Sequence, residues 1–258
     1  MVGKSKKKLI SSLSLKKYRD KTGLFVAEGT KLVNDLLDAG INEEIILTTD
    51  SNVLKSGNRE YLVDVVDSRE IKQVSFLKTP QKILAVLKKP EFTFTFGEHS
   101  DSLTLCLDGI QDPGNMGTIL RLADWFGIPY VVCSKDTADV FNPKVVQASM
   151  GAFARVKVFY TDLTTFCLRS ARELNLPVFG TFMNGENIYS ASLSRKGLII
   201  LGNEGQGIRP ETEKTVTKRL SIPKFNRQRG ISTMESLNVG MAASIICSEF
   251  RRPFFLSE

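Results

Sequence analysis

A regular alternation of strand-like and helix-like runs after residue 103 is the feature that most constrains how this chain can fold. Short apolar runs predict strands, and the longer runs between most of them have the spacing of amphipathic helices. Strands are predicted at 103–107, 130–133, 154–159, 177–181, 197–201 and 219–222, and helices at 116–126, 143–150, 162–174, 209–216 and 236–250. This order predicts an α/β fold with a parallel sheet covered by helices on both faces.

The N-terminal part of the chain predicts a smaller α/β module. Residues 23–29 form a strand-like run that ends at a glycine, and Thr30 is placed to cap an amphipathic helix at 31–39. Gly40 follows this helix, as expected of a C-terminal glycine. Further strands are expected at 45–48, 61–66 and 83–86, and a further helix at 68–77.

A polar stretch at residues 89–102 separates this module from the alternating region. Its Phe/Thr alternation at 92–96 fits a half-buried strand as well as a linker. Domain boundaries usually fall in such polar segments. We therefore predict an N-terminal domain of residues 1–95 and a C-terminal domain of residues 103–258.

The composition is that of an ordinary globular chain, with 42% hydrophobic and 24% charged residues among 258. No apolar run is long enough to span a bilayer, and the basic N-terminus lacks the apolar stretch of a signal peptide. A cytoplasmic location is therefore the default expectation. The four cysteines are scattered and His99 is the only histidine, which argues against a metal site and against a histidine base.

A net charge of +7 suits a polyanionic partner. Eight basic residues crowd the first two dozen positions, and a second basic cluster runs from Lys218 to Arg229. For the N-terminal cluster, a solvated charged face and an RNA contact explain the pattern equally well. The second cluster favours RNA more strongly, because it adjoins a predicted functional site.

That site is predicted by three clusters of polar residues and glycines at 108–117, 202–207 and 236–240. The first two follow strands and the third opens the last helix. Ligands of parallel sheets bind beyond the carboxyl ends of the strands, so the clusters are expected to converge on one pocket.

Each cluster also has a purely structural interpretation. Glycine-rich turns are common after strands, Asn115 could cap the helix that follows it, and Ser236 could cap the last helix. Arg121 lies among apolar residues on a helix, so its guanidinium must either extend to solvent or bind an anion. A phosphate or carboxylate ligand fits this need, and an ion pair with Asp124 or Glu204 is the alternative.

Taken together, the clusters resemble the motifs of the SpoU/TrmH family of RNA ribose methyltransferases. Asn115 with Arg121 resembles the first motif, and residues 202–207 resemble the second. Ile222-Pro223 followed by Ser236-Leu237-Asn238-Val239 resembles the third. Residues 23–29 are similar to the substrate-binding domain of the family, which resembles ribosomal proteins that bind kinked RNA.

The resemblance implies a C-terminal α/β trefoil-knot domain with S-adenosylmethionine as cofactor. By position, the cofactor site would be lined by Thr181, Gly202, Ile222 and Leu237. It also implies a homodimer formed through the C-terminal domain, and the apolar face of Leu237, Met241 and Ile245 is compatible with such an interface.

The implied reaction is methylation of a ribose 2′-hydroxyl in structured RNA, with ribosomal RNA favoured over transfer RNA. Arg121 would activate the hydroxyl, as a base or as a cation assisted by a substrate phosphate. The orienting residues would be Asn115, Glu204, Ser236 and Asn238. The RNA would be bound by Lys16, Lys17, Arg19, Lys224, Arg227 and Arg229. The 2′-hydroxyl makes DNA an unsuitable substrate.

Two other functions compete with this interpretation. A non-catalytic RNA-binding or ribosome-assembly factor on the same fold would not need all five catalytic candidates. A nicotinamide-dependent enzyme would need a Gly-x-Gly-x-x-Gly turn, which the first strand lacks. The chain also departs from the family pattern at Gly240 and in the basic loop 224–233, which points to altered RNA contacts.

Overall fold

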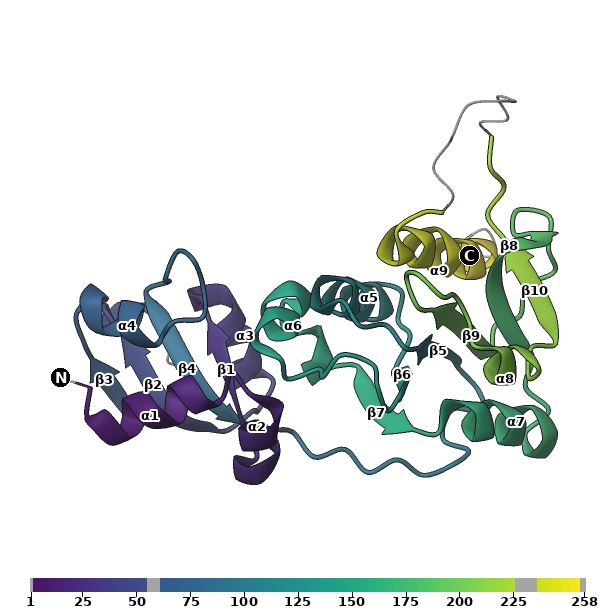
Figure 1. The fold of residues 1–258 in the computed structure, drawn as a ribbon. Coiled ribbons are helices and arrows are strands. Elements are labelled where there is room, and N and C mark those ends of the chain that lie inside the picture. The colour runs from purple at the N-terminus through teal and green to yellow at the C-terminus, as the bar shows by residue number, and fades with distance from the viewer. Residues whose placement is uncertain (1, 55–60, 226–235, 256–258) are drawn as a thin grey trace. The chain divides into compact units, whose positions relative to one another are not determined.

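The computed structural model describes residues 2–54, 61–225 and 236–255 (Figure 1). Contacts divide the chain into two compact units. The first contains residues 1–91 together with 139–155, and the second contains residues 92–138 and 156–258. Arg227 and Arg229, two of the residues expected to bind RNA, lie outside the described residues.

The first unit is built on a four-stranded sheet in the order β1-β4-β2-β3. β4 is antiparallel to both of its neighbours, and β3 is parallel to β2. Its elements are α1 (Lys4–Ser12), α2 (Lys16–Thr22), β1 (Leu24–Glu28), α3 (Thr30–Asp38), β2 (Glu43–Thr48), η1 (Ser51–Val53), β3 (Val63–Val65), α4 (Ser68–Val74) and β4 (Ile83–Lys88). All strands and helices predicted between residues 23 and 88 are present, with shifted ends.

A segment from the middle of the chain completes this unit. α6 (Pro143–Ser149) and η2 (Ala152–Ala154) come between two strands of the other sheet, yet α6 packs against β1. Phe25 of β1 contacts the rings of Phe141 and Phe153 at centroid distances of 5.2 and 5.5 Å. The predicted boundary assigned this segment to the C-terminal domain, because an amphipathic helix does not reveal which sheet it covers.

The second unit contains a six-stranded sheet in the order β10-β8-β9-β5-β6-β7, and every pair is parallel. This confirms the predicted fold class. Its elements are β5 (Leu103–Asp108), α5 (Pro113–Trp125), β6 (Tyr130–Ser134), β7 (Lys157–Thr161), α7 (Leu163–Glu173), β8 (Val178–Asn187), β9 (Gly197–Gly202), α8 (Pro210–Glu213), β10 (Lys218–Ser221) and α9 (Val239–Phe255).

Helices cover both faces of this sheet, as Figure 1 shows. Successive residues of a strand point to opposite faces. Val178 packs in the cluster that contains Phe166 of α7, whereas the next residue, Phe179, contacts Phe250 of α9 at 4.9 Å between centroids. The near-continuous burial of β5 and β9 follows from this double cover.

α9 runs beside α5 in the same direction. The N-terminal part of α9 meets the start of α5, where a Cβ on Gly240 would lie 3.0 Å from Thr118 Cγ2. Near the other end, Arg251 donates to the carbonyl oxygens of Phe126 and Gly127 at 2.7 Å. Close contact between the helices therefore explains the glycine at position 240.

The structure decides one alternative that the sequence left open and corrects two local predictions. Residues 92–96 form no strand; Phe94 and Phe96 pack instead around His99. The helix predicted from residue 116 begins at Pro113 and is capped by Asp112, not Asn115. Thr30 is the first residue of α3 and Gly29, with φ of +106°, precedes it as the cap.

None of the helices in the described part of the chain is long and apolar enough to cross a bilayer. All four cysteines are free and buried, as expected. Burial raises the pKa of the Cys133 and Cys247 thiols, that of Cys247 to about 12, so neither is a ready nucleophile. Within the described ranges, no group of histidine, cysteine or acidic residues could hold a metal ion.

Candidate active site

The first two polar clusters meet where the order of the strands reverses. β5 and β9 are neighbours, with Asp108 beside Gly202 at their carboxyl ends. The chain goes from β5 outward to β7 on one side, and then crosses to β8 and β10 on the other. Such a reversal creates a crevice that parallel α/β proteins use for ligands. The fold therefore places the loops 109–112 and 203–207 at one edge.

The loop after β9 is held closed by its own backbone. Asn203 and Gly207 exchange two backbone hydrogen bonds of 2.9 Å. A Cβ on Gly202 would lie 2.3 Å from the carbonyl carbon of Gly207 and from the nitrogen of Ile208. The close backbone contacts of this loop therefore require a glycine at position 202. This requirement is separate from the predicted role of Gly202 in lining the cofactor site.

A chain of side-chain hydrogen bonds joins the three clusters. Asn115 Nδ2 donates to Glu204 Oε1 at 2.9 Å, and Asn238 Nδ2 donates to Asn115 Oδ1 at 2.9 Å. These residues are separated by 89 and 123 positions in the sequence. The predicted convergence of Asn115, Glu204 and Asn238 is therefore present in the structure.

Local capping explains why these amides are held in place. Asp112 Oδ1 accepts from the backbone N–H of Asn115, which leaves the Asn115 side chain for longer-range contacts. Asn238 precedes the first residue of α9, and its Oδ1 accepts from the N–H of Gly240 at 2.9 Å. The cap of α9 is therefore Asn238 rather than Ser236, and its Nδ2 is aimed at Asn115.

Arg121 and Ser236 do not take part in the hydrogen bonds that join Glu204, Asn115 and Asn238. Both side chains are exposed, and neither forms a hydrogen bond or ion pair with any residue in the described ranges. The ion pair of Arg121 with Asp124 or Glu204, which the sequence left open, is not formed. An exposed guanidinium without a carboxylate partner remains able to bind an external anion.

Three of the residues predicted to bind the cofactor belong to, or directly follow, three adjacent strands. Thr181 lies in β8, Gly202 ends β9, and Ile222 comes directly after β10. The β8–β10 pairing skips residues 181–185, because Arg219 pairs with Gly180 and Leu220 pairs with Glu186. This register shift begins at Thr181, so the candidate residues lie at an irregular strand pairing or at a strand end, where backbone groups are available to a ligand. Leu237 is 46% exposed beside the start of α9.

Asn203, which lies in the second predicted cluster, has a structural role that the sequence did not predict. Its Nδ2 donates to the carbonyl oxygen of Gly109 at 2.7 Å, and its Oδ1 accepts from the N–H groups of Gly205 and Gln206. It therefore ties the loop after β9 to the loop after β5. Its position next to Glu204 and between two glycines was the available signal.

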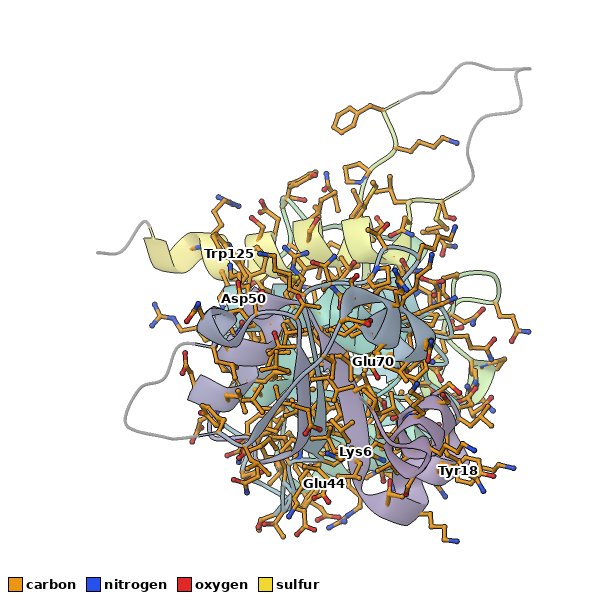
Figure 2. All side chains as sticks on the ribbon, turned by 90° about the vertical axis from the view of Figure 1, so that its left-hand side faces the viewer. Lys6, Tyr18, Glu44, Asp50, Glu70 and Trp125 are labelled. Atoms are coloured by element: carbon orange, nitrogen blue, oxygen red, sulfur yellow. The ribbon has the colours of Figure 1, made fainter. Side chains whose placement is uncertain are left out.

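The basic residues of α2 divide into exposed and buried. Lys16 is exposed and pairs with Asp20 at 2.6 Å, and Lys17 lies over the ring of Tyr18, a surface residue labelled in Figure 2. Arg19 is only 2% exposed, and its guanidinium binds Asp139 and the carbonyl oxygens of Leu13 and Ser14. The expectation that Arg19 contacts RNA was wrong, because its donors are engaged inside the protein.

His99, the only histidine, has a structural role and is not one of the residues that form this site. It is fully buried, and its Nε2 lies 3.0 Å from Ser170 Oγ. Burial lowers the pKa of its imidazole. The residues that meet at the sheet edge are instead amides, a carboxylate and a nearby free arginine, which together can bind and orient a polar substrate.

Comparisons with known proteins agree with this class of site. The SpoU rRNA Methylase family profile matches residues 102–248, and the MRM3-like substrate binding domain profile matches residues 4–85. The chain is 31% identical over 244 residues to the 23S rRNA (guanosine(2553)-2′-O)-methyltransferase RlmP of Bacillus subtilis, with 93% of each chain covered. It is 36% identical to the 23S rRNA (guanosine-2′-O-)-methyltransferase RlmB of Neisseria meningitidis over 58% of each chain.

Solved structures show the same architecture. A TrmH-family protein from Porphyromonas gingivalis superposes with a TM-score of 0.86 at 38% identity, covering 98% of this chain and 99% of that one. An AdoMet-bound rRNA methyltransferase from Sinorhizobium meliloti superposes with a TM-score of 0.77 at 26% identity, covering 98% and 97%.

The fold and the site thus define an S-adenosylmethionine-dependent RNA 2′-O-methyltransferase with a separate N-terminal substrate-binding domain. The chain belongs to the SpoU rRNA methylase family.

Proposed function

We propose that this protein transfers a methyl group from S-adenosylmethionine to the 2′-hydroxyl of a guanosine in 23S ribosomal RNA. The hydrogen-bonded chain Glu204–Asn115–Asn238, with the unpaired Arg121 on the same helix as Asn115, is the observation that carries this proposal. The choice of substrate rests on RlmP and RlmB, whose names specify guanosine in 23S rRNA.

In this proposal Arg121 activates the attacking hydroxyl as a cation. An arginine resists deprotonation, so it acts by favouring the negative charge that develops on the 2′-oxygen, and a phosphate of the substrate RNA would take the hydroxyl proton. The amides of Asn115 and Asn238 orient the ribose, with Glu204 fixing the amide of Asn115. Ser236, in the segment that precedes α9, would contact the substrate once it is bound. Because the sulfonium of the cofactor is already a strong leaving group, positioning supplies much of the acceleration.

The cofactor would be held by Thr181, Gly202, Ile222 and Leu237, at the edge formed by β8, β9 and β10. Thr181 Oγ1 donates to the carbonyl oxygen of Ile200 at 3.0 Å, which ties this part of β8 to β9. We further propose that the C-terminal unit contains the trefoil knot of the family.

The RNA would be gripped by the exposed lysines Lys16 and Lys17 of the N-terminal unit and by Lys224 beside the cofactor edge. The match of residues 4–85 to a substrate-binding domain profile supports a role of the N-terminal unit in RNA binding. We also propose a homodimer through the C-terminal unit, supported by the exposed side chains of Trp125 (83%, labelled in Figure 2) and Met241 (63%). The cytoplasmic location stays a prediction.

The test is methyl transfer from labelled S-adenosylmethionine into ribosomal RNA from cells that lack this protein. We expect label in 2′-O-methylguanosine, and its loss in Arg121→Ala. The matched control is Arg169→Ala, which removes an exposed arginine of α7 that pairs with Glu173. If RNA and cofactor bind but no label is transferred, the chain is a binding protein on this fold.

A further inference from the structure

We propose that Arg209 is a positioning residue of this enzyme: it clamps the end of β5 and thereby aligns the amides of the active site. The inference rests on the proposed methyl transfer, but it concerns a residue outside the three motifs. Arg209 lies just before α8, in the connection that follows the loop after β9.

Arg209 is the cation that faces a buried carboxylate at the last residue of β5. Asp108 is 1% exposed, and its Oδ2 accepts from the backbone N–H of Arg209 at 2.9 Å. Its Oδ1 lies 3.4 Å from Arg209 Nε and has no hydrogen bond to the described part of the chain. A buried carboxylate is costly unless a cation lies beside it, which binds the two residues together.

The same guanidinium reaches a second carboxylate on the neighbouring strand connection. Arg209 Nη2 donates to Asp136 Oδ2 at 2.5 Å, and Asp136 Oδ1 accepts from Ser134 Oγ at 2.7 Å. Ser134 Oγ in turn accepts from the N–H of Gly109 at 2.9 Å. The hydrogen bond from Arg209 holds the pKa of Asp136 below its usual value, so this bridge is charged at neutral pH.

Gly109 is therefore enclosed by the Arg209 bridge. Its φ is +72°, and a Cβ at this position would lie 2.8 Å from Arg209 Nη2. Its N–H is held by Ser134, and its carbonyl oxygen accepts from Asn203 Nδ2 at 2.7 Å. The guanidinium thus supports the residue from which the loop to α5 starts.

The hydrogen bonds continue from Gly109 to the amides that orient the ribose. Asn203 Nδ2 also lies 3.4 Å from Glu204 Oε2, and Glu204 Oε1 accepts from Asn115. Displacement of Gly109 would shift Asn203 and, through Glu204, the amide of Asn115. A misplacement of about 1 Å in such a site can cost on the order of a hundredfold in rate. Arg209 would therefore act on the chemical step without touching the substrate.

The experiment separates alignment from charge neutralisation. We would measure kcat, KM for RNA, cofactor affinity by calorimetry, and Tm for Arg209→Gln, Arg209→Lys and the double variant Asp108→Asn/Arg209→Gln. The control is Arg169→Gln on α7, an exposed pair with Glu173. The double variant removes the buried carboxylate of Asp108 together with its cation, which restores Tm if Arg209→Gln lowers it by leaving Asp108 unpaired.

We expect Arg209→Gln to lower kcat by about ten- to a hundredfold, with KM for RNA within about twofold. The kcat of Arg209→Lys should lie between those of the wild type and of Arg209→Gln, because an ammonium group lacks the planar fork that bridges both carboxylates. The double variant should regain the wild-type Tm and keep the low kcat. Wild-type kcat in the double variant would overturn the proposal, since Arg209 would then be only a counter-ion. An inactive wild-type enzyme would instead overturn the proposed methyl transfer.

Discussion

Arg19 and Arg121 lie on helices of the two different units, and the sequence analysis predicted that both of them act on RNA. In the first unit, Arg19 is buried and its donors are used by Asp139 and two carbonyl groups. In the second, Arg121 is exposed and has no partner in the described ranges. One arginine therefore stabilises a fold, and the other is left free to act on a ligand.

The same difference holds for the acidic residues. Glu28 of the first unit is 4% exposed, and it accepts from Ser75 Oγ at 2.5 Å and from the N–H of Phe76 at 2.8 Å. Glu204 of the second unit is exposed and accepts from the amide of Asn115. Buried polar groups that are fully paired give rigidity, whereas exposed polar groups keep part of their hydrogen-bonding capacity available for binding.

The largest expected effect is a difference in stability between variants of the two arginines. Arg19→Met should lower the free energy of unfolding by about 3–5 kcal/mol, because it leaves Asp139 partly buried without its cation. Arg121→Met should change it by less than about 0.5 kcal/mol, because the side chain is exposed and unpaired. Urea denaturation of both variants checks this. Equal stability losses would contradict the contrast between the two units.

The two functions of Asn238 can be separated in the same way. Asn238→Ala removes both the helix cap and the donor to Asn115, so we expect a loss of about 1 kcal/mol in stability and a lower kcat. Asn238→Asp keeps an oxygen for the cap and loses only the donor. It should retain stability and lose rate, as measured by thermal unfolding and single-turnover methylation. Wild-type kcat in Asn238→Asp would show that the Asn115 contact is not used.

A pH effect is expected from the buried His99 in the second unit. Burial lowers the pKa of its imidazole, so the folded state stays neutral where the unfolded state takes up a proton, near pH 6.5. Stability should therefore be full above this pH and fall below it, by at most about 1.4 kcal/mol per pH unit. Denaturation at several pH values should show a shallower slope for His99→Gln, in which an amide can still donate to Ser170. An identical slope would mean that other groups cause the effect.

The smallest effect concerns the exposed lysines of the first unit. Lys16→Ala and Lys17→Ala should each reduce the slope of log K for RNA against log salt concentration by about 1. Folding stability should barely change, since the Lys16–Asp20 pair is exposed. Filter binding between ~50 and ~200 mM salt measures the slope. Unchanged slopes would place the RNA elsewhere on the protein.

The sequence alone determined the alternation of strands and helices, and hence the parallel sheet. It also determined that Asn115, Glu204 and Asn238 follow strand ends or open a helix, which brings them to one edge. These properties depend on side-chain periodicity and on the glycines and caps that end each element, all of which are local.

Only the tertiary structure decided which partner each polar group takes. Arg19 meets Asp139 across 120 positions, α6 joins a sheet other than the one its neighbours belong to, and Arg209 bridges two carboxylates at the end of β5. Local patterns carry no information about such pairs, because a helix shows which face is apolar and not what covers it. Burial and hydrogen-bond partners, set by packing across the chain, separate the arginine that holds the fold from the arginine that remains free.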